Sequence, residues 1–247
     1  MMFTKPSDSI RYAKEKLYNH GVEVFSGRWQ SVDVDQSMME LLNHTIKFVI
    51  PESMDKVIEE VKPNLPWAQD HLEERVGGKP LNPPPSNEWW PFAQKNNSRF
   101  KKKKQFSHTY PERLWTPKLK GIRYDYGDMG DVVEMLKKEP YTRQAFLPMW
   151  FPEDTGAVHG ERVPCTIGYH FIRRDDIMHL TYYIRSCDYL RHLRDDIYLA
   201  CGKLFWILEQ LKDEPGWSNV KPGYFNMHIV SLHCFKNELG VLKQRNK

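Results

Sequence analysis

The stretch from residue 166 to residue 235 constrains the fold of this chain more than any other. Residues 166–173 and 177–184 are rich in Ile, Tyr and Phe, and Arg174-Asp175-Asp176 joins them. Two β-prone segments separated by a short polar turn are typical of an antiparallel hairpin. The sequence therefore predicts an antiparallel hairpin here.

A long helix and a further strand are expected after this hairpin. From Asp196 to Leu211 apolar residues recur every three or four places, which predicts the longest apolar helix of the chain. The first turn of this helix would present Asp195 and Asp196 toward a ligand held by the hairpin. Residues 224–235 return as a strand. We expect residues 1–247 to form one α+β domain, with a large mixed or antiparallel sheet and flanking helices, because no linker divides them.

Shorter elements are expected before the hairpin. They are helices over 7–20, 52–61 and 131–138 and strands over 22–34, 45–50 and 145–150. Ser7 and Asp8 can cap the first helix. Residues 79–97 are rich in Pro, Asn and Trp, so we expect them to be mostly loop that can line a cleft.

Composition excludes several classes of protein. The four cysteines form no CxxC pair, so neither a zinc ribbon nor a disulfide scaffold is indicated. His228 and His233 would face opposite sides of one strand, and no metal site is expected. The sequence has no apolar leader and no long apolar run, which predicts a soluble cytoplasmic protein without a membrane partner. The net charge of +4 suits a binder of small phosphorylated ligands or a weak nucleic-acid binder.

Four side chains indicate covalent chemistry on a pyrimidine nucleotide. They are the thiol of Cys165, the adjacent Arg185 and Ser186, and the carboxylate of Asp196. A thiol can add to C6 of the ring, an Arg-Ser pair can hold a phosphate, and a carboxylate can pair with the Watson-Crick edge of the base. A lone cysteine at a strand start is usually a core residue, so the combination carries the hypothesis.

These motifs resemble the thymidylate synthase superfamily, which includes the deoxycytidylate hydroxymethylases of bacteriophages. The matching motifs are Pro164-Cys165, Arg185-Ser186-Cys187-Asp188, Asp196 and Ser231-Leu232-His233, within a resemblance that covers roughly residues 106–235. It implies that the Cys165 thiolate adds to C6 of the base. The C5 carbon then attacks the one-carbon unit of 5,10-methylenetetrahydrofolate, the implied cofactor.

The resemblance also implies roles for further residues. Binding of the phosphate is assigned to Arg185, Ser186, Arg143 and Arg28, and contact with the sugar to His233. Tyr110 and Asp188 are assigned to catalysis near the reacting carbon. The residues assigned to the cofactor are Trp89, Trp90 and Asp188. In the family the segment of Arg143 reaches across a dimer interface, which implies a homodimer here.

Asp196 is the most informative departure from the thymidylate synthases, which resemble one another in having Asn eight residues after the position of Asp188. An Asn amide offers a donor and an acceptor, which match uracil. A carboxylate offers acceptors only, which match the amino group of cytosine. Asp196 therefore indicates dCMP, as in the deoxycytidylate hydroxymethylases.

Other departures concern the rest of the site. Gln144 replaces a second arginine, Phe235 replaces a tyrosine of the sugar site, and Asn64 stands where the family has a glutamate. The closing C-terminal segment of the synthases is also expected to be missing, which favours access of water. The role of that glutamate must come from elsewhere, and the candidates are Asp70, Glu73 and Glu74.

We therefore expect a homodimeric deoxycytidylate 5-hydroxymethyltransferase, in the host cytoplasm if a phage encodes it. The alternatives are a thymidylate synthase or dCMP methyltransferase, which deliver hydride instead of water, and a hydroxymethylase of the ribonucleotide CMP. A different class, suggested by the run Lys101–Lys104, is a nucleic-acid-binding protein that retains the fold. Nucleic acid is not the expected partner.

Overall fold

The computed structural model describes residues 1–25, 37–92, 101–102, 104–115, 128–152, 154–155 and 162–244. Arg28, expected at the phosphate, lies outside the described residues. So do most of the expected strand over 22–34 and the end of the loop over 79–97.

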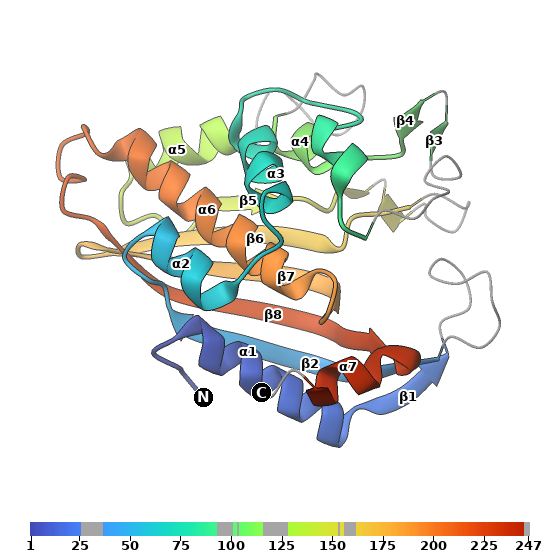
Figure 1. The fold of residues 1–247 in the computed structure, drawn as a ribbon. Coiled ribbons are helices and arrows are strands. Elements are labelled where there is room, and N and C mark those ends of the chain that lie inside the picture. Colours follow the sequence, from blue (N-terminus) through green and yellow to red (C-terminus); the bar gives the residue numbers. More distant parts are fainter. Residues whose placement is uncertain are drawn as a thin grey trace.

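A six-stranded mixed sheet is the centre of the fold (Figure 1). In spatial order its strands are β1 (Val22–Phe25), β2 (Ser37–Val49), β8 (Lys221–Phe235), β7 (Ile177–Asp188), β6 (Thr166–Arg174) and β5 (Phe146–Pro148). All neighbours are antiparallel except β7 and β8, which are parallel. The expected hairpin is therefore confirmed as β6 and β7. A separate small hairpin pairs β3 (Lys101–Lys102) with β4 (Gln105–Phe106).

The parallel pair requires a crossover, and α6 (Leu193–Leu211) provides it. This 19-residue helix buries most of its side chains and begins three residues before the expected start at Asp196. Helices α1, α2 and α6 lie across the same side of the sheet (Figure 1). Their apolar side chains join those of the strands in one core.

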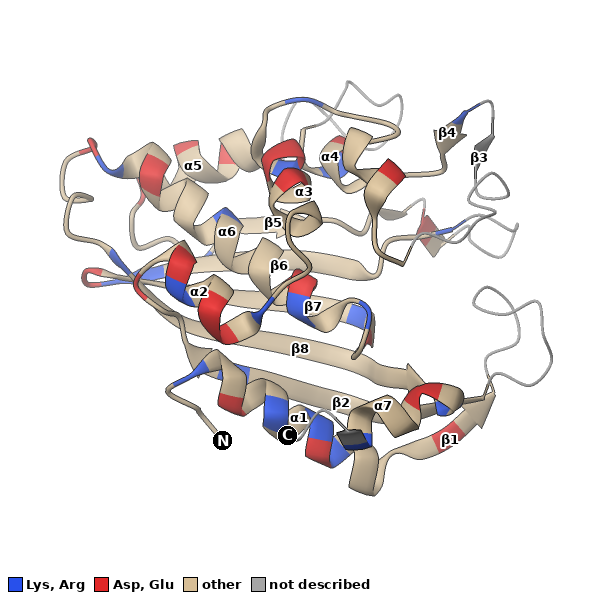
Figure 2. Cartoon of the chain, viewed as in Figure 1, with Lys and Arg blue, Asp and Glu red and all other residues tan. Residues whose placement is uncertain are grey.

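The other described helices are shorter than α6. They are α1 (Pro6–His20), α2 (Met54–Val61), α3 (Trp67–Val76), α4 (Tyr110–Leu114), α5 (Met129–Lys138) and α7 (Leu239–Gln244), with 3-10 turns at Pro85–Trp89 and Lys236–Glu238. Charges of both signs are interspersed on α1 and α2, whereas most of the strand length is uncharged (Figure 2). Among the described residues, no helix has the length and apolar character needed to cross a membrane.

The opposite side of the sheet is left uncovered by the described helices. Along most of β7 and β8 the residues that face the helices are buried, and the residues that alternate with them point to the other side and are partly or largely exposed. We name this second surface the open face. On β7 and β8 it comprises Ile177, His179, Thr181, Tyr183, Tyr224, Asn226, His228 and Val230.

The structure confirms the α+β class and corrects several local predictions. Ser7 and Asp8 do not cap α1, which begins earlier at Pro6, because the fixed φ of proline suits the first helical position. The hydroxyl of Ser7 instead donates to Glu60. Strand β7 runs on to Asp188 instead of ending at 184.

Helices α3, α4 and α7 were not anticipated. The buried face of α3 includes His71 and Arg75, so its apolar periodicity is weak. Helix α4 is only five residues long and starts from a capping box in which Thr109 and Glu112 bond each other's backbone N–H groups. Such short elements leave little periodic signal.

Candidate active site

Cys165 lies at the start of β6, where Arg185 of β7 fixes it. The backbone N–H of Arg185 donates to the Cys165 carbonyl (2.9 Å), and its Nε donates to the Pro164 carbonyl (2.9 Å). A terminal guanidinium nitrogen is 3.9 Å from the Cys165 Sγ. The hairpin therefore places a permanent positive charge against the thiol.

Burial raises the pKa of the Cys165 thiol, since a thiolate is costly in an apolar environment. The positive charge of Arg185 opposes this shift, and the negative charge of Asp196 adds to it. Formation of the thiolate at Cys165 thus depends on the arginine beside it.

Asp196 lies in the first turn of α6, and its Oδ2 accepts a hydrogen bond from the Cys187 Sγ (3.7 Å). Burial raises the pKa of Asp196 to about 7, Asp195 contributes to the rise, and Arg75 opposes it. A carboxyl group with this pKa exchanges its proton near neutrality. Asp196 can therefore act as an acceptor only, or as a donor and an acceptor.

Tyr110 reaches the same strand start. Its hydroxyl oxygen accepts hydrogen bonds from the backbone N–H and the Oγ1 of Thr166 (both 3.3 Å), the residue after Cys165. The Thr166 Oγ1 also lies 2.9 Å from the Tyr182 hydroxyl. The structure therefore brings Tyr110, Cys165 and Asp196 together, as the sequence suggested.

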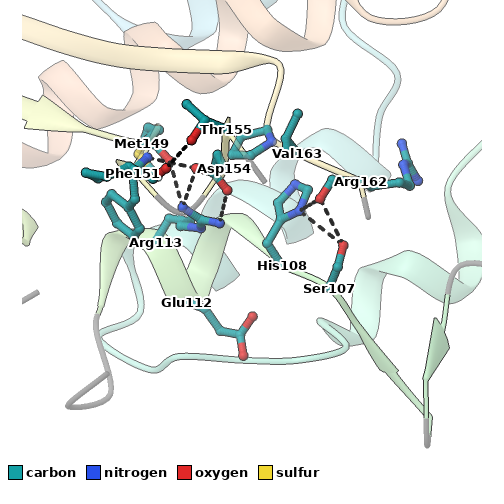
Figure 3. A network of polar contacts seen from close by, with 12 residues as sticks. Ser107, His108, Glu112, Arg113, Met149, Phe151, Asp154, Thr155, Arg162 and Val163 are labelled. Carbon is teal, nitrogen blue, oxygen red and sulfur yellow. Dashed lines mark hydrogen bonds and ion pairs between the residues drawn. The ribbon is translucent and has the colours of Figure 1, made fainter. Parts of the chain in front are cut away.

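A network of polar contacts surrounds Arg113 and His108, which lie on and just before α4, the helix that begins at Tyr110 (Figure 3). The Arg113 guanidinium forms a two-pronged ion pair with Asp154 (2.8 and 2.9 Å), and both side chains are almost buried. Just before Tyr110 in the chain, Ser107 and His108 each donate a hydrogen bond to the backbone carbonyl of Arg162 (3.1 and 3.2 Å). These contacts attach α4 to the two segments that precede Cys165.

The register of β7 against β8 brings together the expected sugar and cofactor residues. Asp188 pairs with His233, and Ser186 pairs with Ser231. Asp188 accepts hydrogen bonds from the backbone N–H groups of Leu190 (2.9 Å) and Arg191 (3.1 Å). Because the buried Nε2 of His233 has no hydrogen-bond partner among the described residues, it is available to a ligand.

A pocket of about 170 Å³ opens beside Tyr110. Its lining is Trp67, His71, Pro84, Ser86, Asn87, Trp90, Phe106, Ser107, His108, Thr109, Tyr110 and Arg162. Trp90 stacks on His192 at 5.2 Å, and its buried Nε1 has no partner in the described part of the chain. A flat ring with a buried donor suits stacking by a heteroaromatic ring of a ligand.

The structure separates the two tryptophans. Trp90 lines the pocket, whereas Trp89 is 47% exposed and donates from its Nε1 to Asp70 (2.9 Å). The assignment of Trp89 to the cofactor stays a prediction without a contact that supports it.

Arg143 is exposed, and only its backbone carbonyl has a described contact, from the His170 Nε2 (2.9 Å). No described contact joins Arg143 to Arg185 or Ser186 within the chain. Gln144 beside it is exposed as well. The role of Arg143 at a phosphate stays a prediction.

Asn64 does not take the place of the family glutamate beside Cys165. Its backbone N–H and its Nδ2 both donate to the carboxylate of Asp195 (2.8 Å each). Among the three suggested substitutes, Glu74 contacts two residues of the pocket wall, which are His71 and Ser86. Asp70 is bonded to Trp89, and Glu73 is exposed.

Sequence reasoning missed two buried cations, Arg75 and Lys203, which are 4% and 0% exposed. The Nζ of Lys203 donates to the Leu199 carbonyl (2.9 Å), and burial lowers the pKa of this amine well below its ordinary value. The signal for Lys203 was its position in the apolar stripe of the helix, between Ala200 and Ile207. No cluster of three or more possible metal ligands occurs among the described residues.

Comparisons with known proteins agree with this geometry. The family model described as "Thymidylate synthase" matches residues 86–246. A candidate thymidylate synthase of Methanococcoides burtonii is 31% identical over 234 residues, which cover 94% of this chain and 87% of the relative. Another, of Methanosarcina mazei, is 32% identical over 140 residues, covering 56% of this chain and 57% of the relative. The thermostable thymidylate synthase A from Bacillus subtilis shares the fold, with a TM-score of 0.68, 16% identity and coverage of 97% of this chain and 83% of that chain.

Proposed function

Because the chain belongs to the thymidylate synthase family, we propose that residues 1–247 form one catalytic domain that transfers a one-carbon unit to C5 of dCMP, giving 5-hydroxymethyl-dCMP. The family consists of one-carbon transferases that act on pyrimidine nucleotides. The observation that carries the choice of dCMP is the buried carboxyl of Asp196, which lies in the first turn of α6 and whose charge acts on the thiol of Cys165.

Cys165 supplies the nucleophile. Its sulfur bonds to C6 of the base and the electron pair of the C5–C6 double bond moves toward C5, which makes C5 nucleophilic. Arg185 supports the thiolate from 3.9 Å. Tyr110, held over Thr166, lies where it can exchange a proton with the substrate or with water near C5. Loss of the C5 proton and of the sulfur restores the ring.

Asp196 reads the base. Its ionised carboxylate accepts from the N4 amino group of cytosine and repels the O4 oxygen of uracil. We expect about ten- to hundredfold preference for dCMP from one such buried mismatch. Arg185 and Ser186, with Arg143 and Arg28, hold the phosphate, and His233 contacts the sugar through its unpartnered Nε2.

The cofactor of the family is methylenetetrahydrofolate, and the pocket at Trp90 suits its ring. Trp90 would stack on the ring and donate from its Nε1, with Asp188 at the same end of β7. When bound, the cofactor supplies the one-carbon unit at the oxidation level of formaldehyde. Once this carbon has been transferred to C5 with release of tetrahydrofolate, water adds to it to give the hydroxymethyl group, as in the deoxycytidylate hydroxymethylases of bacteriophages.

The active form is a homodimer, as is common in the family. The open face presents exposed apolar and aromatic residues, among them Tyr224 (49% exposed) and Val230 (46% exposed). A second copy would bury these residues. Arg143, exposed beside β5, would then reach the partner's phosphate site.

A product assay tests the proposal. Methylenetetrahydrofolate, dCMP and dUMP are offered together to the wild type, to Asp196→Asn and to the matched control Asp195→Asn, whose carboxylate faces Asn64 instead. We expect the wild type and the control to add the mass of CH₂O to dCMP, and Asp196→Asn to shift toward dUMP. Addition to dUMP alone by the wild type would contradict the proposal.

Thymidylate synthesis from dUMP is the second candidate, and two observations favour it. The relatives are named as candidate thymidylate synthases. In addition, a pKa of about 7 lets Asp196 carry a proton, and a protonated carboxyl offers a donor and an acceptor as asparagine does. The same assay separates the two, because this reaction adds the mass of CH₂ to dUMP.

A further inference from the structure

His71 and Glu74 form a hydrogen-bonded pair at the wall of the pocket beside Tyr110. Both belong to α3, and their side chains are only 10% and 12% exposed. The Nδ1 of His71 lies 3.1 Å from the Glu74 carboxylate and 2.9 Å from the Ser86 hydroxyl. Both described hydrogen bonds of the ring use Nδ1, so Nε2 has no partner in the described part of the chain. Since His71 lines the pocket, its Nε2 is available to a ligand there.

The Glu74 carboxylate determines which ring nitrogen of His71 carries the proton. Ser86 donates to this carboxylate from its backbone N–H and from its hydroxyl. Burial alone would raise the pKa of Glu74, but the hydrogen bonds from His71 and Ser86 outweigh burial and lower it, so the group is ionised at neutral pH. Burial lowers the pKa of His71, so its ring is neutral. Because the hydroxyl hydrogen of Ser86 is directed to Glu74, Nδ1 must carry the ring proton, and Nε2 is an acceptor.

Trp90 adds a hydrogen-bond donor to the same pocket. The rings of Trp67 and His71, one helical turn apart, stack at 4.9 Å, and the Trp90 ring lies 6.1 Å from that of Trp67. The Trp67 Nε1 donates to the Ser86 carbonyl (3.0 Å), whereas the buried Nε1 of Trp90 has no partner among the described residues. Aromatic walls that offer an acceptor and a donor favour a flat ligand with both kinds of group on its ring.

We propose that Glu74 makes His71 a hydrogen-bond acceptor that selects a pterin-type ring, whose N–H group donates to the His71 Nε2. This inference rests on the proposed function, in which the pocket holds the ring of methylenetetrahydrofolate. A pterin ring carries N–H and amino donors beside acceptor atoms, so it can satisfy both His71 and Trp90. A ring without a donor would leave Nε2 unpaired and would bind more weakly. Glu74 does not line the pocket and is a positioning residue, because it acts through His71.

The first test observes the protonation of the His71 ring without any ligand. Protein labelled with ¹⁵N in its histidines is studied by NMR at neutral pH, and His71→Asn identifies the signal. We expect the proton on Nδ1 in the wild type and on Nε2 in Glu74→Gln, since the new amide can donate to Nδ1. His179 is an internal reference, because its Nδ1 accepts from the backbone N–H of Tyr224 (3.1 Å) and its proton must be on Nε2. A wild-type His71 with its proton on Nε2 overturns the proposal.

The second test measures the affinity for tetrahydrofolate, with dCMP or dUMP present, by the quenching of tryptophan fluorescence. His71→Asn keeps a donor for Glu74 near the position of Nδ1 but has no counterpart of Nε2, so a purely structural role of His71 predicts unchanged binding. We expect His71→Asn and Glu74→Gln each to weaken binding about tenfold. The control His20→Asn makes the same change at the exposed end of α1 and should leave the affinity unchanged.

The outcomes separate this inference from the proposed function. If the wild type binds tetrahydrofolate and His71→Asn binds it equally well, the role of His71 is overturned while the proposed function stands. If the wild type binds no tetrahydrofolate with either nucleotide, the proposed function is overturned and the pterin ligand with it.

Discussion

Tyr182 and Tyr183 are neighbours on β7, yet they belong to two different environments. Tyr182 is fully buried, stacks on Tyr169 at 4.6 Å and bonds Thr166 beside the reactive thiol. Tyr183 lies on the open face and stacks on His228 at 5.5 Å. The alternation of a strand thus gives one side chain to the site and the next to a surface.

The two sides of the sheet differ in their exposure to water, which the helices exclude from the covered side. On the covered side, burial raises the pKa of Cys165 and of Asp196, and it raises the pKa of Tyr182 well above its ordinary value. On the open face, partial burial lowers the pKa of His228. Helices α3 and α6 therefore bury the groups of the candidate site, whereas the open face leaves aromatic side chains partly exposed.

The largest expected effect is on the covered side. Cys165→Ser should reduce turnover by about 10³-fold or more, because a hydroxyl is a much weaker nucleophile than a thiolate. Nucleotide binding should remain, as measured by calorimetry. Cys201→Ala is the matched control, since that thiol is fully buried in α6 away from the hairpin. Turnover by Cys165→Ser at the wild-type rate would remove the covalent mechanism.

The ion pair between Arg113 and Asp154 should contribute most to stability on the covered side. Asp154→Ala removes the carboxylate that pairs with the nearly buried guanidinium of Arg113, at a cost of about 3–5 kcal/mol in the free energy of unfolding. Urea denaturation followed by fluorescence measures it. Lys236→Ala, which breaks an exposed pair with Glu23, should change the stability little. Equal losses of stability in Asp154→Ala and Lys236→Ala would show that burial does not determine how much these ion pairs contribute.

The sequence predicted the parts of this site that depend on residue type and strand order. Cys165, Arg185 and Asp196 meet because a hairpin, a helix and a further strand follow one another, and that order of elements is visible in the periodicity, whereas the parallel pairing of β7 with β8 was not predicted. Arg75 was not predicted, because an arginine on a short helix usually faces solvent. The different surroundings of Trp89 and Trp90 were also not predicted, since two aromatic residues in a loop carry no periodic signal.

A smaller effect concerns pH and Asp196. Its pKa rises from the ordinary value of 3.8 to about 7 in the folded chain, so between these values the folded form holds a proton that the unfolded form has lost. This stabilisation is complete below pH 3.8 and is lost as the pH rises through 7. Asp196→Asn has no proton to lose. Relative to the wild type, this variant should gain about 2 kcal/mol in unfolding free energy between pH 5 and pH 8. Parallel stability curves would show that Asp196 does not titrate in this range.

The smallest expected effect is on the open face, and it separates Tyr183 from its neighbour. Tyr183→Ala removes a partly exposed ring that stacks on His228 and lies near the ring of Phe146, so the unfolding free energy should change by less than about 1 kcal/mol. Self-association should weaken about tenfold in sedimentation experiments, because the ring would be buried by the second copy. Tyr182→Ala should do the reverse, losing about 3–5 kcal/mol of stability through the cavity that it leaves. If Tyr183→Ala associates as tightly as the wild type, the open face is not the dimer interface, and Arg143 cannot reach a partner's phosphate site by that route.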